Sequence, residues 1–316
     1  MIVALVKSLK SSTLFKGRQL LMMAAITLGY MLVSYLLIGF RPEQVFLISM
    51  VNILYFASVK TRKFVIGFSV FIVYWVLFDY MKAFPNYKFN AVYIADLYAF
   101  EKNWFGISYN GSIITPNEYW LLHSNTFLDI LTGFFYLTWV PVPLLFGGYL
   151  FARHRKEFFH FAFSFLVINL VGFVGYYAYP AAPPWYVQNH GFIFEPGTLS
   201  NTAGLSRFDA FFGVEIFKSL YAKGSNVFAA MPSLHSAYPT LVLYYGLRNR
   251  LGYMNVIFAT IMVGVWFAAV YTSHHYIADV VAGIVCAVVG IVFYNALTRT
   301  AWLNRFINKM VTNTVI

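Results

Sequence analysis

The sequence predicts an all-α integral membrane protein, a polytopic bundle of about eight transmembrane helices. Of its 316 residues, 60% are hydrophobic and only 10% are charged, whereas an ordinary soluble domain carries about 25% charged residues. Long apolar runs recur along the chain and are separated by short basic clusters. No polar stretch is long enough to bury a core of its own, so the sequence excludes a separate soluble domain.

Eight apolar segments account for the predicted spans. Each approaches the roughly 20 residues that a helix needs to cross the hydrocarbon core, although the second is short and requires its ends to lie in the interface. Pro141 and Pro143 are expected to kink the fourth segment, because proline removes a backbone donor and clashes with the preceding turn. In chain order the segments are residues 20–40, 44–59, 64–80, 126–151, 158–179, 232–247, 253–271 and 276–298.

Two long segments interrupt the series of spans. Residues 81–125 are mixed polar and aromatic, which favours a partly helical excursion along the membrane interface. Residues 180–230 form a long polar loop that is rich in Gly, Pro and aromatic side chains. We therefore divide the chain into an N-terminal two-helix hairpin, residues 1–63, and a six-helix membrane domain, residues 64–316, which carries both loops.

The distribution of basic residues predicts the orientation, because cytoplasmic segments carry an excess of Lys and Arg. With the N-terminus inside, 15 of the 22 Lys and Arg residues fall on the inner side. This topology brings His235, His275 and the loop of residues 180–230 together on the outer face. The outer basic residues are Arg41, Lys82, Lys88, Lys102, Arg207, Lys218 and Lys223.

The composition also excludes several classes of partner and site. The net charge of +11 does not indicate nucleic acid, because the basic residues lie between apolar runs, as topology signals do. The one cysteine, Cys286, lies inside an apolar run, which excludes a disulfide framework and a cysteine-based metal site. The basic N-terminus precedes a long apolar run without a small-residue cleavage site, so we expect an anchor rather than a removed signal peptide.

Two short polar stretches, residues 231–236 and 274–279, stand at the heads of the sixth and eighth spans. His275 and Asp279 are spaced i, i+4, which places them on one helix face within reach of each other. A carboxylate that accepts one imidazole N–H fixes the tautomer and makes the other nitrogen a better nucleophile or base. His235, on the same side of the membrane, can protonate a leaving group. The set suits phosphoryl transfer through a phosphohistidine.

Such a reaction requires stabilisation of the charge on the phosphoryl oxygens. The backbone N–H groups near Ser233 and Leu234 can contribute, because helix N-termini favour anions. The Ser233 hydroxyl can add one donor. Arg207, Lys218 and Lys223 are the cations in the same outer loop. No cofactor or metal is required, because cations and helix N-termini can meet the charge of a phosphodiester.

Simpler interpretations of the polar residues stay open. A single histidine at a membrane helix end is often only interfacial, although a set of two histidines and one aspartate on one face is harder to explain in this way. His235, His275 and Asp279 also have the ligand types of a zinc site. His274 points to another part of the helix surface and is secondary.

Other polar and aromatic residues have structural explanations as well. Asp129 and Asp79 are most simply helix-end or packing residues. Trp185 and Tyr186 most simply belong to an aromatic belt at the membrane interface, with lipid binding as the second interpretation.

The two polar stretches resemble motifs of the type 2 phosphatidic acid phosphatases. The second motif of that superfamily, Pro-Ser-Gly-His, reads Pro-Ser-Leu-His at residues 232–235, and the third ends in His-x-x-x-Asp, here His275 to Asp279. Leu234 replaces the glycine, and Ala269 occupies the position of the arginine that is expected six residues before the third-motif histidine. No Lys-x6-Arg-Pro first motif is present, so the chain departs from the usual phosphate clamp.

With these departures the chain resembles one branch of the superfamily, the inositol phosphorylceramide synthases. That branch carries Ala-Pro-Pro-Trp-Tyr, Gly-Leu-x-Arg-Phe-Asp, Pro-Ser-Leu-His and His-Tyr-x-x-Asp. The chain has these four elements in the same order, at residues 182–186, 204–209, 232–235 and 275–279. Sphingomyelin synthases share the last element but lack Pro-Pro-Trp-Tyr. The resemblance covers the last two thirds of the chain.

The resemblance implies a membrane phosphotransferase that moves phosphoinositol from phosphatidylinositol onto the primary hydroxyl of ceramide or dihydroceramide and releases diacylglycerol. In this interpretation His275 attacks the phosphorus, Asp279 orients His275, and His235 protonates the departing oxygen and then accepts the proton of the incoming hydroxyl. Arg207 supplies the cation that is missing at Ala269. The further candidates for contact with phosphate or substrate are Ser233, Asp209, Trp185, Tyr186, Lys218 and Lys223.

Two alternatives to a transferase remain. A lipid phosphate phosphatase would use water as the acceptor. A transporter or channel is disfavoured, because no line of ionisable residues runs through the spans. An outward-facing site means the periplasmic side of a bacterial inner membrane, which the short loops and tails favour, or alternatively the lumen of the Golgi.

Overall fold

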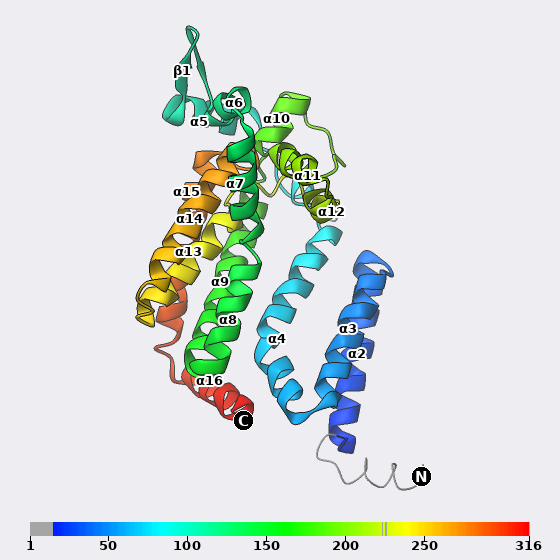
Figure 1. Ribbon diagram of the computed structural model, residues 1–316. Helices are drawn as coiled ribbons and strands as arrows, with labels where there is room; N and C mark the ends of the chain where they lie inside the picture. Colours follow the sequence, from blue (N-terminus) through cyan, green and yellow to red (C-terminus); the bar gives the residue numbers. More distant parts are fainter. Residues whose placement is uncertain (1–14, 223, 225, 316) are drawn as a thin grey trace. The chain divides into compact units, whose positions relative to one another are not determined.

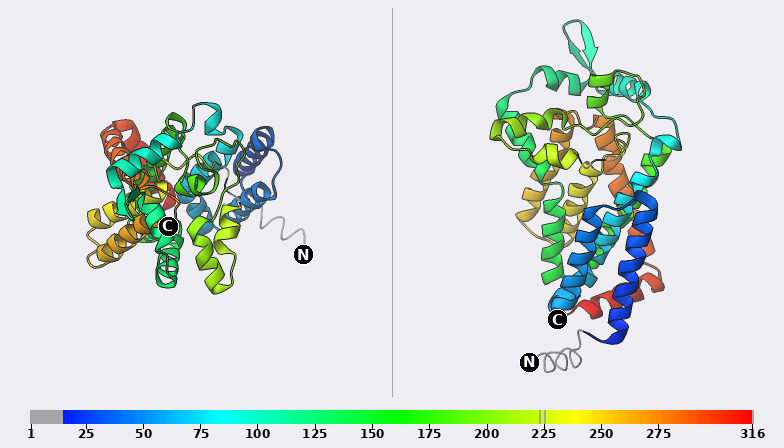
Figure 2. Two further views of the ribbon diagram at one scale, coloured as in Figure 1. Left: turned by 90° about the horizontal axis from the view of Figure 1, so that it is seen from above. Right: turned by 90° about the vertical axis from the view of Figure 1, so that its right-hand side faces the viewer.

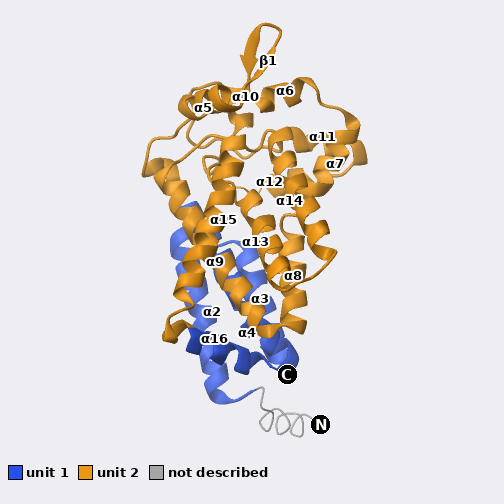
Figure 3. Cartoon of the chain, turned by 90° about the vertical axis from the view of Figure 1, so that its left-hand side faces the viewer, with its two compact units in different colours: residues 1–83, 304–316 blue, residues 84–303 orange. Residues whose placement is uncertain are grey.

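The computed structural model describes residues 15–222, 224 and 226–315. It confirms the all-α class (Figure 1): in the described part of the chain the only strands are β1 (Ile107–Tyr109) and β2 (Ser112–Ile114), which pair as a short antiparallel hairpin. Packing separates the chain into two compact units (Figure 3), Met1–Ala83 with Asn304–Ile316 and Phe84–Leu303.

Helices occupy all eight predicted spans. Six of the eight are long and apolar enough to cross a membrane, with α7 and α8 counted as one. The other two, α3 and α13, have 16 and 15 residues, fewer than the roughly 20 of a full span, so the number of eight spans stays a prediction. The helices are α2 (Gly17–Ile38), α3 (Pro42–Ala57), α4 (Val59–Tyr80), α7 (Thr126–Leu137) with α8 (Pro141–Arg153), α9 (Arg155–Ala178), α13 (Leu234–Arg248), α14 (Met254–Tyr271) and α15 (Ile277–Leu297).

In the first unit α3 packs against α4 and α2. Met23, Val51, Tyr55 and Val65 form its buried core. Because α4 packs here, the compact units divide at Ala83, whereas the sequence analysis placed a boundary after residue 63. The assignment of separate roles to the two parts stays a prediction. The amphipathic C-terminal helix α16 (Ala301–Thr314) begins in the second unit and ends in the first.

In the second unit the short helix α13 lies at the centre of the bundle. It packs against α14, α15, α9 and α8, which explains how a 15-residue helix with several polar side chains is accommodated. Gly283 of α15 allows the backbones of α13 and α15 to approach closely, since a Cβ there would lie 2.1 Å from the carbonyl oxygen of Ser233. The predicted kink at Pro141 is confirmed as a break, because α7 ends at Leu137 and α8 starts at Pro141.

The two interrupting segments gather at one end of the second unit's helices (Figures 1 and 2). As predicted, the first is partly helical, although its hairpin was not expected. The loop of residues 180–230 contains several short helices rather than irregular chain alone. Ala181 forms parallel bridges to Tyr93 and to Ala229, so the two segments are joined. Their elements are η1 (Met81–Ala83), η2 (Asn86–Lys88), α5 (Ala95–Phe105), α6 (Pro116–Leu122), α10 (Pro184–His190), η3 (Ala203–Leu205), α11 (Ser206–Phe212) and α12 (Ile216–Tyr221).

Candidate active site

Ser233, the N-cap of α13, places His235 in the first helical turn. The Ser233 hydroxyl accepts a hydrogen bond from the amide of Ser236, and the Ser233 amide donates to the carbonyl of Asp279 at 3.0 Å. The Ser236 hydroxyl donates to the carbonyl of Val280 at 3.1 Å. These bonds tie together the first turns of α13 and α15, which carry His235 and Asp279.

The segment between α14 and α15 turns sharply and carries the second histidine. Ser273 has a left-handed backbone with φ of 60°, which is uncommon for a residue with a side chain. The amides of His274 and His275 both donate to the carbonyl of Ala269 at 3.0 Å. His275 therefore lies just before α15, whose N-cap is Tyr276, rather than within the helix.

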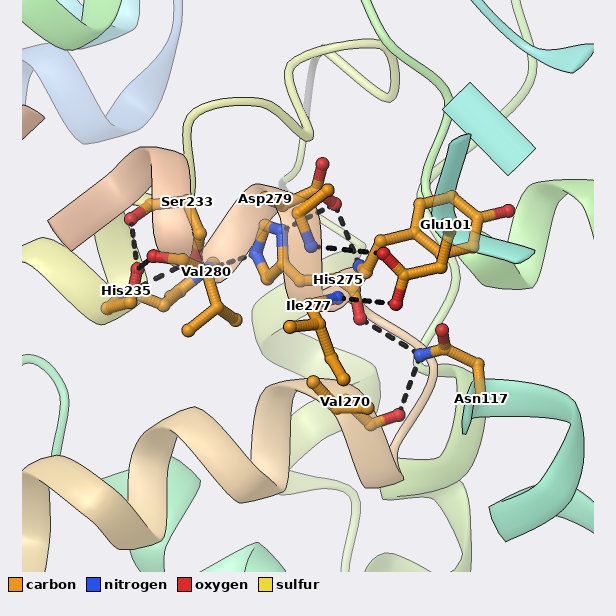
Figure 4. A network of polar contacts seen from close by, with 12 residues as sticks. Glu101, Asn117, Ser233, His235, Val270, His275, Ile277, Asp279 and Val280 are labelled. Carbon is orange, nitrogen blue, oxygen red and sulfur yellow. Dashed lines mark hydrogen bonds and ion pairs between the residues drawn. The ribbon is translucent and has the colours of Figure 1, made fainter. Parts of the chain in front are cut away.

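The structure brings the three predicted chemical groups together (Figure 4). Nδ1 of His235 lies 2.9 Å from Nε2 of His275, and Nδ1 of His275 lies 3.5 Å from Oδ2 of Asp279. His275 is 5% exposed and Asp279 is fully buried. Burial lowers the pKa of His275 to about 4, because desolvation disfavours a charged imidazole. His275 is thus neutral near pH 7, the state in which a ring nitrogen has a lone pair.

Aromatic rings pack against His235 and His274, the two histidines beside His275. Tyr136 and Trp139 pack against His235, with ring centroids 5.1 and 4.5 Å away. Tyr136 and Tyr221 stack on His274, whose Nε2 lies 3.0 Å from the carbonyl oxygen of Thr202. His274 therefore attaches the loop of residues 180–230 to the turn. Within the described residues no group of three His, Cys, Asp or Glu side chains has a geometry suited to a metal ion.

Arg207 is held by a carboxylate. Its Nε donates to Oδ1 of Asp129 at 2.6 Å, and its guanidinium lies over the ring of Tyr271. The hydroxyl of Tyr271 donates to the same Asp129 oxygen at 2.8 Å. The amide of Gly204 donates to the carbonyl of Thr272, so the loop that carries Arg207 adjoins the turn between α14 and α15, which carries His275. Asp129 thus has an ion-pairing role beyond the packing role we expected, and phosphate contact by Arg207 stays a prediction.

The remaining candidates from the loop have visible structural roles. Asp209 is buried, and its two carboxylate oxygens accept the amides of Phe217 and Lys218 at the start of α12. The Lys218 ammonium pairs with Glu215, and both side chains are exposed. Lys223 lies outside the described residues.

Trp185 and Tyr186 are buried rather than arranged in an interfacial belt. They are 5% and 0% exposed and belong to a cluster with Ile94 and Phe228. The Tyr186 hydroxyl is engaged by two backbone groups within the loop. The amide of Trp185 donates to the carbonyl of Ser273 at 3.0 Å, so this pair supports the turn between α14 and α15 by packing and by one backbone bond.

Sequence reasoning missed two buried residues of the segment 81–125. Glu101 accepts the amides of Ile277 and Ala278 at 2.8 and 3.0 Å. The Nδ2 of Asn117 donates to the carbonyls of Val270 and His275, at 2.8 and 2.9 Å. Figure 4 shows both side chains reaching the turn from the side opposite His235. The sequence shows Glu101 only as a carboxylate in a segment expected at the membrane interface. Its partners are backbone groups, which the sequence does not reveal.

The part of the chain that holds these residues resembles known proteins. The model of the PAP2 superfamily matches residues 96–293, which include every site residue described above. The chain belongs to the PAP2 superfamily. This result confirms the resemblance to the type 2 phosphatidic acid phosphatases.

Named relatives place the chain in the inositol phosphorylceramide synthase branch. The phosphoinositol dihydroceramide synthase of Bacteroides thetaiotaomicron is 44% identical over 267 residues, which cover 84% of this chain and 88% of the relative. The inositol phosphorylceramide synthase of Candida albicans is 31% identical over 51% of this chain and 36% of its own length. The catalytic subunit of that synthase from Saccharomyces cerevisiae is 26% identical, over 52% and 42%. The matches therefore span less than half of these fungal relatives. No solved structure matches the chain.

Two of the departures from the superfamily motifs lie in packed surroundings. Leu234, at the motif glycine, packs against α9 at Gly172, where a Cβ would lie 2.7 Å from its side chain. Ala269, at the motif arginine, is fully buried in a core cluster with Leu205 and Phe208. An arginine at position 269 would displace this core.

Proposed function

We propose that the protein transfers phosphoinositol from phosphatidylinositol to ceramide or dihydroceramide and releases diacylglycerol. The observation that carries this proposal is the contact of His235 with His275, with Asp279 behind His275. The 44% identity to a phosphoinositol dihydroceramide synthase supports the choice of donor and acceptor.

The first step uses His275 as the nucleophile. The negative charge of Asp279, whose Oδ2 lies 3.5 Å from Nδ1 of His275, favours the tautomer with the N–H at Nδ1, so the lone pair lies on Nε2. A bond forms between Nε2 and the phosphorus, and the bond from the phosphorus to the diacylglycerol oxygen breaks. Because Nε2 faces His235, the phosphoryl group enters where these two nitrogens meet.

The second imidazole balances the protons. His235 in its protonated form gives a proton to the departing diacylglycerol oxygen. It then accepts the proton of the ceramide hydroxyl, whose oxygen attacks the phosphorus and breaks the bond to His275. Both imidazoles return to their starting states, and no proton is gained or lost.

The first turn of α13 supports the charge of the phosphoryl oxygens. Among the described residues, the amides of Leu234 and His235 have no protein acceptor. Such amides favour an anion, and they lie beside the histidine pair. The equivalent amides of α15 are already occupied by Glu101. Arg207 is our candidate for the additional positive charge.

A purified-protein assay tests the proposal. Phosphatidylinositol labelled in its inositol ring is supplied in lipid nanodiscs with and without ceramide, and the products are identified by mass spectrometry. We expect labelled inositol phosphorylceramide and diacylglycerol in equal amounts, and only when ceramide is present. Release of inositol phosphate at the same rate without ceramide would instead assign the phosphatase reaction.

The protein is a multi-pass membrane protein, and we propose that its site faces the periplasm. The positive-inside distribution supports this orientation. A reporter fused after Arg250, which follows the end of α13, is expected to report the cytoplasm. Reporter activity on the outer side would reverse the topology.

A further inference from the structure

We propose that Glu101 is a positioning residue that holds the nucleophile His275 and its partner Asp279 in register for reaction. The proposal rests on the phosphohistidine mechanism above. Glu101 belongs to α5 and lies 176 positions before its partner Ile277 in the sequence. Its hydrogen bonds to the site are made with backbone amides.

The geometry is that of a carboxylate closing a helix N-terminus. The two oxygens of Glu101 accept the first two amides of α15, from Ile277 and Ala278. These groups have no partner within a helix, and the helix dipole favours a negative charge there. Glu101 is fully buried, so water does not compete for these two bonds.

The bonds bracket the reacting pair. Ile277 follows His275 by two positions, and Ala278 precedes Asp279 directly. A shift of the first turn of α15 would therefore change the separation of the imidazole and the carboxylate, which is already 3.5 Å. Phosphoryl transfer depends on alignment, and misplacement by about 1 Å can cost on the order of a hundredfold in rate.

The other backbone groups of the turn are fixed independently. Asn117 holds the carbonyl of His275, and Ala269 accepts its amide. Removing Glu101 therefore releases one side of the turn rather than unfolding it. This predicts a defect in the chemical step, with substrate affinity largely retained.

Glu118 offers a matched control in the same segment. It is also a carboxylate that caps a helix, since it accepts the amide of Thr115 at 2.7 Å and the hydroxyl of Tyr98 at 2.9 Å. All of these partners belong to the segment 81–125, and none belongs to the turn between α14 and α15. Glu118→Gln thus reproduces the loss of a capping charge without touching His275.

The test compares wild type, Glu101→Gln, Glu101→Asp, Glu118→Gln and His275→Ala in nanodiscs, with thermal unfolding of each. We expect Glu101→Gln to lower kcat by about tenfold to a hundredfold with KM changed less than about twofold. Glu101→Asp keeps the charge and should recover part of the loss, while Glu118→Gln keeps near wild-type kcat.

The outcomes separate this inference from the proposed function. An inactive wild type, or an active His275→Ala variant, would refute the function itself. An active wild type with unchanged kcat in Glu101→Gln would refute the positioning role alone. Two results would show a purely structural role for Glu101. One is an equal loss of kcat in Glu101→Gln and Glu118→Gln that follows their unfolding temperatures. The other is failure of both Glu101 variants to fold.

Discussion

Nδ1 of His235 lies within hydrogen-bonding distance, 2.9 Å, of Nε2 of His275. The two residues are 40 positions apart and come from different helix starts, yet their rings contact directly. One of the two facing nitrogens must carry the proton. In the proposed mechanism the negative charge of Asp279, 3.5 Å from Nδ1 of His275, favours a proton at Nδ1, so the shared proton lies on His235 and the attacking nitrogen is left unprotonated.

Substitution of the nucleophile or its partner should abolish or strongly reduce transfer. His275→Ala removes the attacking nitrogen and is expected to have no measurable activity. Asp279→Asn retains the shape but no longer favours the required tautomer, and comparable changes in other enzymes cost about 10⁴-fold. Product formation by mass spectrometry measures both. Near wild-type activity in purified His275→Ala would refute covalent catalysis.

The role of His235 as a proton donor predicts a dependence on the leaving group. In His235→Ala, the diacylglycerol oxygen must leave unprotonated, and general-acid removal costs about 10²–10⁴-fold. A phosphoinositol ester of p-nitrophenol needs no acid, so we expect a burst of nitrophenolate with that substrate, followed by slow turnover. An absence of the burst with this activated donor would indicate that His235 acts in substrate binding instead.

The buried Glu101 predicts a pH dependence of kcat. Burial raises its pKa to about 7, opposed by the amides of Ala278 and Ile277 and assisted by the negative charge of Asp279. The ionised form accepts both amides, so kcat should rise as pH increases through about 7. Glu101→Gln should lack this rise. The free energy of unfolding should change with pH in the opposite direction from kcat. The raised pKa means that folded Glu101 binds its proton more tightly than the unfolded chain does, so the protein loses stability as pH rises from about 4.5 to 7.

The identity of the phosphate cation can be decided between two loop residues. Arg207 is partly buried and held by Asp129, whereas Lys218 is exposed and paired with Glu215. A fixed guanidinium is better suited to a phosphodiester, so Arg207→Ala should lower kcat/KM by about tenfold or more, and Lys218→Ala should have little effect. A larger loss for Lys218→Ala would transfer the role to Lys218.

The close approach of α15 to α13 predicts a large effect of one methyl group. In Gly283→Ala the new Cβ would lie 2.1 Å from a backbone oxygen of Ser233, and such overpacking costs about 1–3 kcal/mol. Gly148→Ala in α8 is the control, because nothing lies within 4 Å of its Cβ. Thermal unfolding should show a loss for the first variant and no loss for the second.

The helices and the central triad could be predicted because their signals are local. Apolar runs mark spans, and the spacing of His275 and Asp279 alone places them near each other. Counting spans then placed His235 on the same face, which its contact with His275 confirms. The short length of α13 was visible in the sequence, but its central, enclosed position depends on how the neighbouring helices pack.

The side chains that support the turn before α15, which carries His275, could not be predicted. Glu101 and Asn117 bond to backbone groups 176 and 158 positions away, and backbone amides and carbonyls carry no sequence signal. Trp185 and Tyr186 were expected at the interface because an aromatic side chain in a membrane protein suits that place. Their burial reflects the packing of the long loop against the segment 81–125 as well as against itself, which involves contacts distant in the sequence.

The length of α13, 15 residues, also bears on how deep in the bilayer His235 lies. A helix of this length rises about 22 Å, which is less than the roughly 30 Å of the hydrocarbon core. In the topology proposed above, Arg248 marks the cytoplasmic boundary, which would place His235 below the level of the opposite lipid phosphates. We therefore expect both lipids to reach the histidines sideways from the leaflet, with their acyl chains still in the bilayer, and only the inositol head group to extend toward water.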